Sequence, residues 1–316
     1  MLAMCRRDQW DIDDLDWDVE PRELSRDDEI AICQYFKNMA GIELLAGELF
    51  AVQADQTDDP TLRAIFESFV IDEQRHSEVA DRLSAHYDVH GYRQYAPSPE
   101  LVAFGGPFVE AVHHLPPDVA CSYITSGELL LDIALLRSLD DFVDDEMSHR
   151  AMRLINRDES RHIAIDYHMV GFYSSDEYLA WLDEQPPAPT PRRLEAFFAL
   201  ARVLYFAAPF FREVFFRPME LTDPTGHRLF EAFKRMQLLG RKPGVSERPF
   251  AKFLATVQDL FNDPIIGKLF GPLLARLIGL PPAVVQRLYT PEEEARYGQM
   301  SFDELAQEAL GAKTVN

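Results

Sequence analysis

The chain has 316 residues, 47% of them hydrophobic, which is enough to bury a substantial core in one large or two modest domains. Its 53 acidic residues outnumber 31 basic ones, for a formal net charge of −22, and so acidic a chain would repel a phosphate backbone, which argues against nucleic-acid binding. We see no signal-peptide core, no run of about 18 apolar residues and no metal-ligand spacing among the three cysteines. We therefore expect a soluble cytoplasmic protein with reduced thiols, not attached to a membrane.

The first half of the chain predicts an arm followed by two long helices. The first 24 residues are acidic and carry Trp10 and Trp17, which suggests an extended arm with two hydrophobic anchors. A helical pattern follows Ser25, a suitable N-cap, and stops near residues 58–60. The segment 61–87 predicts the second helix.

The rest of the chain also predicts helices. Residues 91–117 are rich in Gly and Pro and indicate a crossover that is too broken for one long helix. Apolar patterns at 118–139 and 149–173 predict a third and a fourth helix. The proline-rich stretch 185–193 marks the best domain boundary, and amphipathic segments beyond it predict further helices. The predicted fold class is all-α.

One pentapeptide pattern occurs twice, as DEQRH at 72–76 and DESRH at 158–162. A glutamate precedes each copy on the previous predicted helix, at Glu43 and at Glu128. The chain thus contains two helical hairpins, each with a Glu on its first helix and Glu-x-x-His on its second. Residues equidistant from the turn of such a hairpin lie at the same level, and both midpoints fall on predicted turns. The same alignment selects Glu43 over Glu48.

This pattern predicts a buried cluster of carboxylates and imidazoles. The Glu and His of each Glu-x-x-His project from one face of the helix. Four carboxylates buried without counter-charge would cost many kcal/mol or become protonated, whereas two divalent cations offset four negative charges. A single Glu-x-x-His motif is more often part of a solvated helix face, but two matched copies are far more specific for a metal site. The predicted metal ligands are Glu43, Glu73, His76, Glu128, Glu159 and His162.

The acidic residue that precedes each Glu ligand has its own predicted role. A metal-bound His usually donates its second N–H to a carboxylate. We expect Asp72 to orient His162 and Asp158 to orient His76, each across to the opposite hairpin. Arg75 and Arg161 are expected to hold these aspartates or the outer edge of the site.

These motifs resemble the ferritin-like di-iron carboxylate proteins, over roughly residues 25–173. The similar branch includes bacterial multicomponent monooxygenase hydroxylases, acyl-carrier-protein desaturases, the small subunit of ribonucleotide reductase and arylamine N-oxygenases. The resemblance implies a ferritin-like four-helix bundle with two iron ions, manganese and iron being the alternative, and with dioxygen and an external electron donor. We expect an N-terminal arm at 1–24, the bundle at 25–182 and a C-terminal helical extension at 183–316.

The chain departs from the family patterns at three positions. Ala80 stands where the ribonucleotide reductase subunit has its radical tyrosine, and Ile155 where one type of N-oxygenase has an extra His ligand. Asp132 stands where multicomponent hydroxylases have a Thr. We name Asp132 as the candidate catalytic proton donor or extra ligand, a salt-bridged or solvated Asp being an equal alternative. Asp166 is expected to lie beside the ligands or at the surface.

The resemblance implies an oxygen-dependent non-haem di-iron monooxygenase or oxidase. Such an enzyme would hydroxylate, N-oxygenate or desaturate a small organic metabolite through a peroxo-type intermediate. The alternative from another class is a ferroxidase, or another iron- or manganese-handling ferritin-like protein without an organic substrate. The chain is longer than a four-helix storage subunit needs, which favours the enzyme, and no lost ligand favours a lapsed scaffold.

Two further features bear on substrate and partners. Aromatic residues of the C-terminal helices are candidates for the roof of an apolar pocket, although ordinary helix packing is the commoner role; they are Phe197, Phe198, Phe206, Phe210 and Phe211. A basic cluster is a candidate docking site for a carrier protein, a reductase or a ferredoxin, a solvated helix face being the alternative; it comprises Arg228, Lys234, Arg235, Arg241, Lys242, Arg248 and Lys252. A homodimer is also compatible with the sequence.

Overall fold

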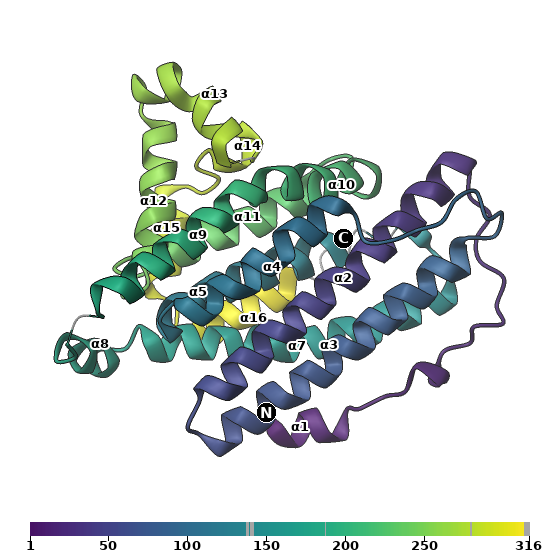
Figure 1. Cartoon of the computed structure of the whole chain (residues 1–316), viewed down its shortest axis with the longest axis horizontal. Coiled ribbons are helices and arrows are strands. Elements are labelled where there is room, and N and C mark those ends of the chain that lie inside the picture. Colours follow the sequence, from purple (N-terminus) through teal and green to yellow (C-terminus); the bar gives the residue numbers. More distant parts are fainter. Residues whose placement is uncertain (137–138, 140–141, 187, 279, 313–316) are drawn as a thin grey trace.

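The computed structural model of the chain is all-helical, and its described residues contain no strand (Figure 1). The described residues are 1–136, 139, 142–186, 188–278 and 280–312. The predicted fold class is thus confirmed at the level of all-α.

The first hairpin consists of α2 (Arg26–Gln56) and α3 (Pro60–Tyr87). The Ser25 side chain caps α2 by accepting a hydrogen bond from the backbone N–H of Asp28. The Asp59 side chain caps α3 in the same way, with Pro60 at the first helical position, where its missing N–H costs nothing. The two helices and the turn between them lie where the sequence predicts them.

The second hairpin consists of α5 (Pro117–Leu130) and α7 (Glu146–Tyr173). A π-helical turn, η2 (Leu131–Leu136), continues α5 directly after the segment that carries Glu128. Such turns are rare and are frequently found at functional sites. Asp145 caps α7 by accepting a hydrogen bond from the backbone N–H of Ser148. The hairpin matches the predicted third and fourth helices.

The predicted crossover contains a helix that its Gly- and Pro-rich sequence does not predict. Helix α4 (Pro99–His114) has 16 residues, with a proline at its start and Pro107 inside it. Residues 91–117 do not form one long helix, as predicted, but their second half is helical. Pro99 at the first helical position removes no hydrogen bond, and the helix continues through Pro107. Gly105 lets α4 approach α2 closely, since a Cβ there would lie 2.9 Å from the Leu45 side chain.

The four long helices pack around one interior. Helix α2 packs along α3, α5 packs against α7, and contacts from α3 to α7 and from α2 to α5 join the two hairpins. The arm is partly helical, with α1 (Leu2–Arg7) and the short η1 (Ile12–Asp14), and α1 contacts α3. Trp10 is buried in the main core, and Trp17 is partly buried against it.

The C-terminal half adds a second layer of helices on α4 and α5. Helix α9 packs on α4, whereas α11 and α12 pack on α5, and α16 returns to lie along α7 (Figure 1). The elements are α8 (Asp176–Asp183), α9 (Thr190–Phe210), η3 (Phe211–Phe216), α10 (Arg217–Thr222), α11 (His227–Arg241), α12 (Pro249–Asn262), α13 (Ile266–Ile278), α14 (Pro282–Val285), α15 (Pro291–Gln299) and α16 (Phe302–Ala312).

One helical run among the described residues is long and apolar enough to cross a membrane. It spans Thr190–Thr222, reaches a mean hydropathy of 1.5 and has 22% of that window buried. No run of this kind was expected from the sequence. A single such helix is weak evidence for a membrane span, and the run contains a π-helical turn and packs on α4.

The basic cluster is largely an internal feature of the C-terminal helices. Arg235, Lys242 and Arg248 are buried. Arg241 forms an ion pair with Asp259 at 2.5 Å, and Lys234 pairs with Glu293. These five charges are therefore buried or paired within the chain, whereas Lys252 is exposed. A docking role for the cluster stays a prediction.

A buried ion pair joins the two halves of the chain and gives a stability prediction. Asp118, at the start of α5, pairs with Arg248, at the start of α12, and both side chains are at most 9% exposed. We expect Asp118→Ala to lower the free energy of unfolding by roughly 3–5 kcal/mol, because it leaves a buried guanidinium without its partner. Chemical denaturation monitored by circular dichroism measures this change.

The matched control is the exposed pair between Glu110 on α4 and Arg202 on α9. Both of its side chains are more than 40% exposed, so Glu110→Ala should cost less than about 1 kcal/mol. An equal loss in the two variants would contradict the prediction.

Candidate metal centre

All six predicted ligands face the interior of the four long helices. Glu43 lies on α2, the pair at 73 and 76 on α3, Glu128 near the end of α5, and the pair at 159 and 162 on α7. Each side chain is at most 3% exposed. Glu48, which the alignment of the two hairpins rejected in favour of Glu43, is exposed on the outside of α2.

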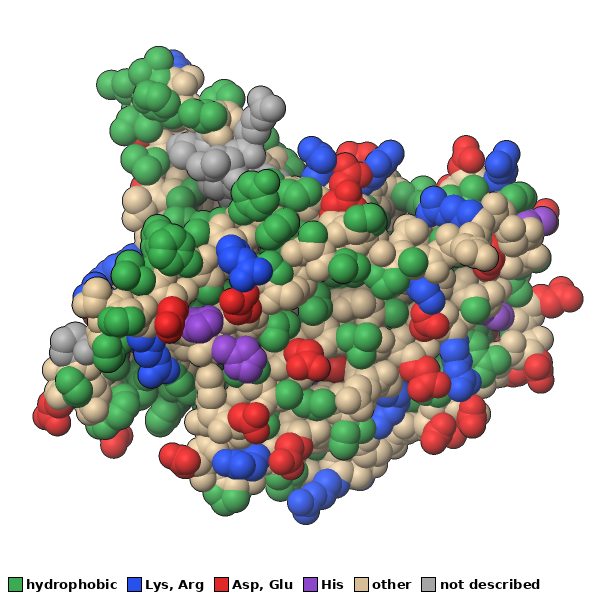
Figure 2. All heavy atoms as spheres, viewed as in Figure 1, with side chains coloured by type: hydrophobic (Ala, Val, Ile, Leu, Met, Phe, Trp, Pro, Cys, Tyr) green, Lys and Arg blue, Asp and Glu red, His purple; other side chains and the backbone are tan. Residues whose placement is uncertain are grey.

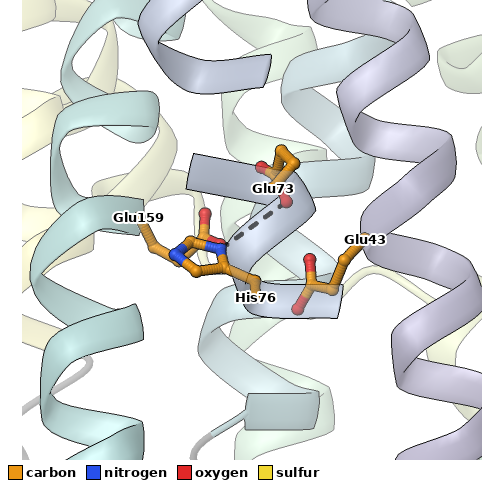
Figure 3. A group of neighbouring side chains, drawn as sticks. All are labelled: Glu43, Glu73, His76 and Glu159. Carbon is orange, nitrogen blue, oxygen red and sulfur yellow. Dashed lines mark ion pairs between the residues drawn. The ribbon is translucent and has the colours of Figure 1, made fainter. Parts of the chain in front are cut away.

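The ligand atoms form two overlapping groups, and within each group all of them lie within 4.8 Å of one another. Figure 3 shows the first group, with side chains from three helices that point toward a common centre. Glu73 and Glu159 belong to both groups, so each hairpin gives one shared carboxylate. The groups are Glu43, Glu73, His76 and Glu159, and Glu73, Glu128, Glu159 and His162.

The two histidines present the same nitrogen to the cluster. His76 Nδ1 lies 3.0 Å from Glu159 Oε1, and His162 Nδ1 lies 2.9 Å from Glu159 Oε2 and 3.1 Å from Glu73 Oε1. Both Nε2 atoms point outward, so Nδ1 is the atom available to a metal. This common orientation follows from the matched position of each His one turn after its Glu.

An outer aspartate faces each of these outward nitrogens, from the opposite hairpin. His76 Nε2 lies 3.4 Å from Asp158 Oδ2, and His162 Nε2 lies 3.7 Å from Asp72 Oδ2. The crossed arrangement is the one that the pentapeptide repeat predicts. When the proton of a neutral imidazole sits on Nε2 and is donated to the carboxylate, Nδ1 carries no proton and can bind a metal.

Two arginines hold the outer aspartates. Arg161 Nη2 bridges them, at 3.0 Å from Asp72 and 2.8 Å from Asp158, and Arg75 Nη1 lies 3.1 Å from Asp72. Burial alone would raise the pKa of Asp72, but His162, His76 and Arg161 together lower it to about 2. The pKa of Asp158 is also lowered, so both aspartates are anions. Asp158 lies within hydrogen-bond distance of His76, whereas Asp72 faces His162 at 3.7 Å.

The N-terminal arm completes this outer layer, a role that was not predicted from the sequence. The Trp10 indole N–H donates to Asp158 Oδ2 at 2.6 Å, and Gln9 Nε2 donates to Asp72 Oδ1 at 3.3 Å. The Arg75 guanidinium stacks over the Trp10 ring at 5.2 Å. Trp10 was identified only as a hydrophobic anchor, because no local pattern links an arm residue to a motif far along the chain.

The electrostatics of the cluster fit a metal ion. Both carboxylate oxygens of Glu43 are buried and have no hydrogen-bond partner among the described residues. Burial, with the nearby Glu73 and Glu159, raises the pKa of Glu43 well above its ordinary value. Burial lowers the pKa of His76 and His162, but the surrounding carboxylates raise both well above the ordinary value. The cluster thus demands positive charge, which a cation supplies.

Two further acidic residues were named from the sequence. Asp166 is fully buried one turn after His162, and burial, opposed by His162 and reinforced by Glu159, raises its pKa to about 8. From the sequence, Asp166 was expected to lie either beside the ligands or at the surface. The structure places it in the interior. The side chain of Asp132 lies outside the described residues, so its candidate catalytic role stays a prediction.

Aromatic rings and close helix packing keep the centre dry. The rings of Phe50 and Phe69 lie 5.0 and 4.1 Å from the His162 ring, centroid to centroid. Gly47 lets α2 approach α3, because a Cβ there would lie 3.3 Å from Glu73 Cβ. Gly47 therefore serves close packing of α2 on α3 beside a candidate ligand.

Two apolar cavities lie on one side of the centre. The proximal cavity has a volume of about 100 Å³ and includes Glu128 in its wall, and the distal cavity has about 200 Å³ and lies beneath α9, α11 and α12. Of the five predicted roof phenylalanines, Phe210 and Phe211 line the proximal cavity. Phe197 and Phe198 are 62% and 61% exposed on α9, so the expectation of a pocket roof or packing core was wrong for them.

No protein-family model, curated protein or solved structure matched the chain.

The first prediction from this geometry concerns the arm. Trp10→Phe removes the N–H that holds Asp158 behind His76, so we expect affinity for Co²⁺ or Fe²⁺ to fall by roughly tenfold, the lower end of effects at such outer partners. Metal titration followed by visible absorption of Co²⁺ measures it. Trp17→Phe is the matched control, because the Trp17 indole donates within the arm to the Ile12 carbonyl. Equal affinities in the two variants would contradict the role of Trp10.

The second prediction concerns Asp166 in the metal-free protein. Its folded-state pKa of about 8 lies above the unfolded value of 3.8, so the folded chain keeps a proton that the unfolded chain loses. The contribution of Asp166 to stability should therefore decline as pH rises from 3.8 to about 8, and level off above that. Urea denaturation in the presence of a chelator, compared with Asp166→Asn, measures this. Parallel pH profiles for wild type and variant would contradict it.

Proposed function

We propose that the chain is an oxygen-dependent non-haem di-iron monooxygenase or oxidase, built on a ferritin-like four-helix bundle, that acts on a small organic molecule. One metal ion would be held by Glu43 and His76 and the other by Glu128 and His162, with Glu73 and Glu159 shared between them. Oxygen and imidazole donors without thiolate favour iron or manganese over zinc. Four carboxylates match two divalent cations in charge.

The bound iron pair would supply electrons to dioxygen, replenished by an external donor. The chain's own residues prepare the place where this happens. Asp158 and Asp72 hold the two imidazoles with Nδ1 turned inward, and Arg161 keeps both aspartates anionic and fixed. The Phe50 and Phe69 rings exclude water from the His162 side. In the metal-free chain, the Asp166 carboxyl lies one turn from His162 and, with a pKa of about 8, retains a proton at neutral pH.

The observation that carries the proposal is the proximal cavity. Among the described residues that line it, Glu128 alone carries a polar side chain. A ferroxidase or an iron store needs a polar path along which iron ions reach the ligands, because an ion pays a high desolvation cost in apolar surroundings. An apolar cavity against a metal ligand instead suits an organic substrate. The cavity therefore favours an oxidase or monooxygenase over the metal-handling alternative.

The test of the proposal is metal stoichiometry combined with oxygen uptake. We expect two Fe²⁺ per chain after anaerobic loading, and oxygen consumption on addition of air. Glu159→Ala should abolish two-metal binding, because Glu159 belongs to both groups. Glu48→Ala, on the exposed outer face of α2, should retain both ions. Retention of two irons by Glu159→Ala would overturn the ligand assignment.

The two function classes differ in their behaviour after the first reaction with oxygen. An enzyme with an organic substrate should consume oxygen in repeated cycles only with a reductant and that substrate. Continued oxidation of added Fe²⁺ with growth of ferric mineral, in the absence of both, would favour the ferroxidase instead.

A further inference from the structure

We infer that the substrate is an elongated, largely apolar molecule with a neutral carbonyl-type acceptor, held by Tyr123 and Gln258 in the distal cavity with its apolar end in the proximal cavity beside Glu128. The placement relative to metal rests on the proposed function. The binding site itself rests on the two cavities and on the donors that line them.

The two cavities adjoin each other. They share five wall residues, namely Phe104, Phe108, Gly127, Leu130 and Phe211. Gly127 is the residue before the ligand Glu128, and a Cβ built at Gly127 would meet no atom within 4 Å. The space at the junction is therefore open, and a molecule longer than either cavity can extend through it toward the metal ligand.

The proximal cavity selects an apolar group. Its wall combines aliphatic side chains of α2 with aromatic side chains of α4 and η3. A polar group of the substrate placed there would lose its hydration without gaining a hydrogen-bond partner, except at Glu128. The end of the substrate nearest the metal site is therefore hydrocarbon.

The distal cavity, in contrast, contains two buried donors that the chain does not use. The Tyr123 hydroxyl and Gln258 Nε2 have no hydrogen-bond partner among the described residues, and the two side chains are 7% and 6% exposed. An unsatisfied buried donor is destabilising, and a ligand acceptor would offset that cost. Ser126, in the same wall, needs no ligand, because its hydroxyl already donates to the Ser122 carbonyl at 2.8 Å.

The orientation of the Gln258 amide is fixed by its neighbours. Its Oε1 accepts from Arg241 Nη2 at 2.9 Å and from the Tyr289 hydroxyl at 3.3 Å, which leaves Nε2 as the free donor. The charge of Arg241 is already balanced by Asp259. A ligand in this cavity thus meets donors without a net positive charge, and these favour a neutral carbonyl over a carboxylate.

Calorimetric binding of decan-2-one to the full-length chain under nitrogen, with and without Fe²⁺, tests the two donors. Tyr123→Phe removes one hydroxyl, and Gln258→Glu removes the amide donor while keeping an acceptor for Arg241. We expect each variant to bind at least roughly threefold more weakly, the loss of one net hydrogen bond, and Ser126→Ala to bind like wild type. Decanoate should bind more weakly than the ketone. Unchanged affinity in both donor variants, no binding at all, or tighter binding of decanoate would overturn the inference.

Chain length tests the passage between the cavities. Gly127→Leu places a side chain in the junction, so we expect it to remove the affinity advantage of decan-2-one over butan-2-one, which fits the distal cavity alone. The control is Gly106→Leu, on the exposed face of α4, where an added Cβ also meets no atom within 4 Å. A retained advantage in Gly127→Leu would show that long ligands do not pass the junction.

These outcomes separate the inference from the proposed function. Binding without Fe²⁺ depends on the cavities alone. If the ketone binds as expected but oxygen uptake is absent in the presence of iron, reductant and ketone, the proposed function fails and the binding site stands. If oxygen is consumed by the iron-loaded chain but no ketone binds, the inference about the substrate fails alone.

Discussion

The mutual repulsion of four buried glutamates is the constraint on which the rest of the structure depends. Their carboxylates lie in an interior whose other residues are mostly apolar, and two imidazoles meet them there. Burial and the neighbouring carboxylates raise the pKa of Glu43, whereas at Glu159 the two imidazoles outweigh burial and lower the pKa. The surrounding aspartates, arginines and arm residues hold the donors together despite this repulsion, and that organisation is what a cation uses.

The centre is built from two matched hairpins, but its surroundings are not symmetric. Trp10 reaches the aspartate behind His76, whereas Gln9 faces the one behind His162. The proximal cavity touches Glu128 and does not include Glu43 among its described wall residues. A duplicated helical pattern thus supplies equivalent ligands, and the elements outside it make the two ends different. The apolar space of the proximal cavity therefore lies at the end of the centre that carries Glu128.

The parts that the sequence predicted are those encoded by local spacing. Glu73 and His76 are one helical turn apart, and capping residues such as Ser25 mark the helix starts, so the hairpins and their inward faces follow from short-range rules. Contacts between distant segments do not follow from such rules. The Trp10 bond to Asp158 spans 148 positions, and the pairing of Arg248 with Asp118 turned an expected surface charge into a buried one. Exposure of Phe197 depends likewise on how α9 lies on α4.

The position of the C-terminal helices gives a physical reason for the length of the chain. The four long helices supply the ligands but only part of the proximal wall, which α4 and η3 complete with Phe104, Phe108 and Phe211. The distal cavity depends on α9, α11 and α12 (Figure 1). Figure 2 shows that apolar side chains also gather on the outer surface over α12 and α13, including Ile265, Leu269 and Leu273 at more than 60% exposed. The extension therefore adds an apolar cavity beside one of the candidate metal ligands.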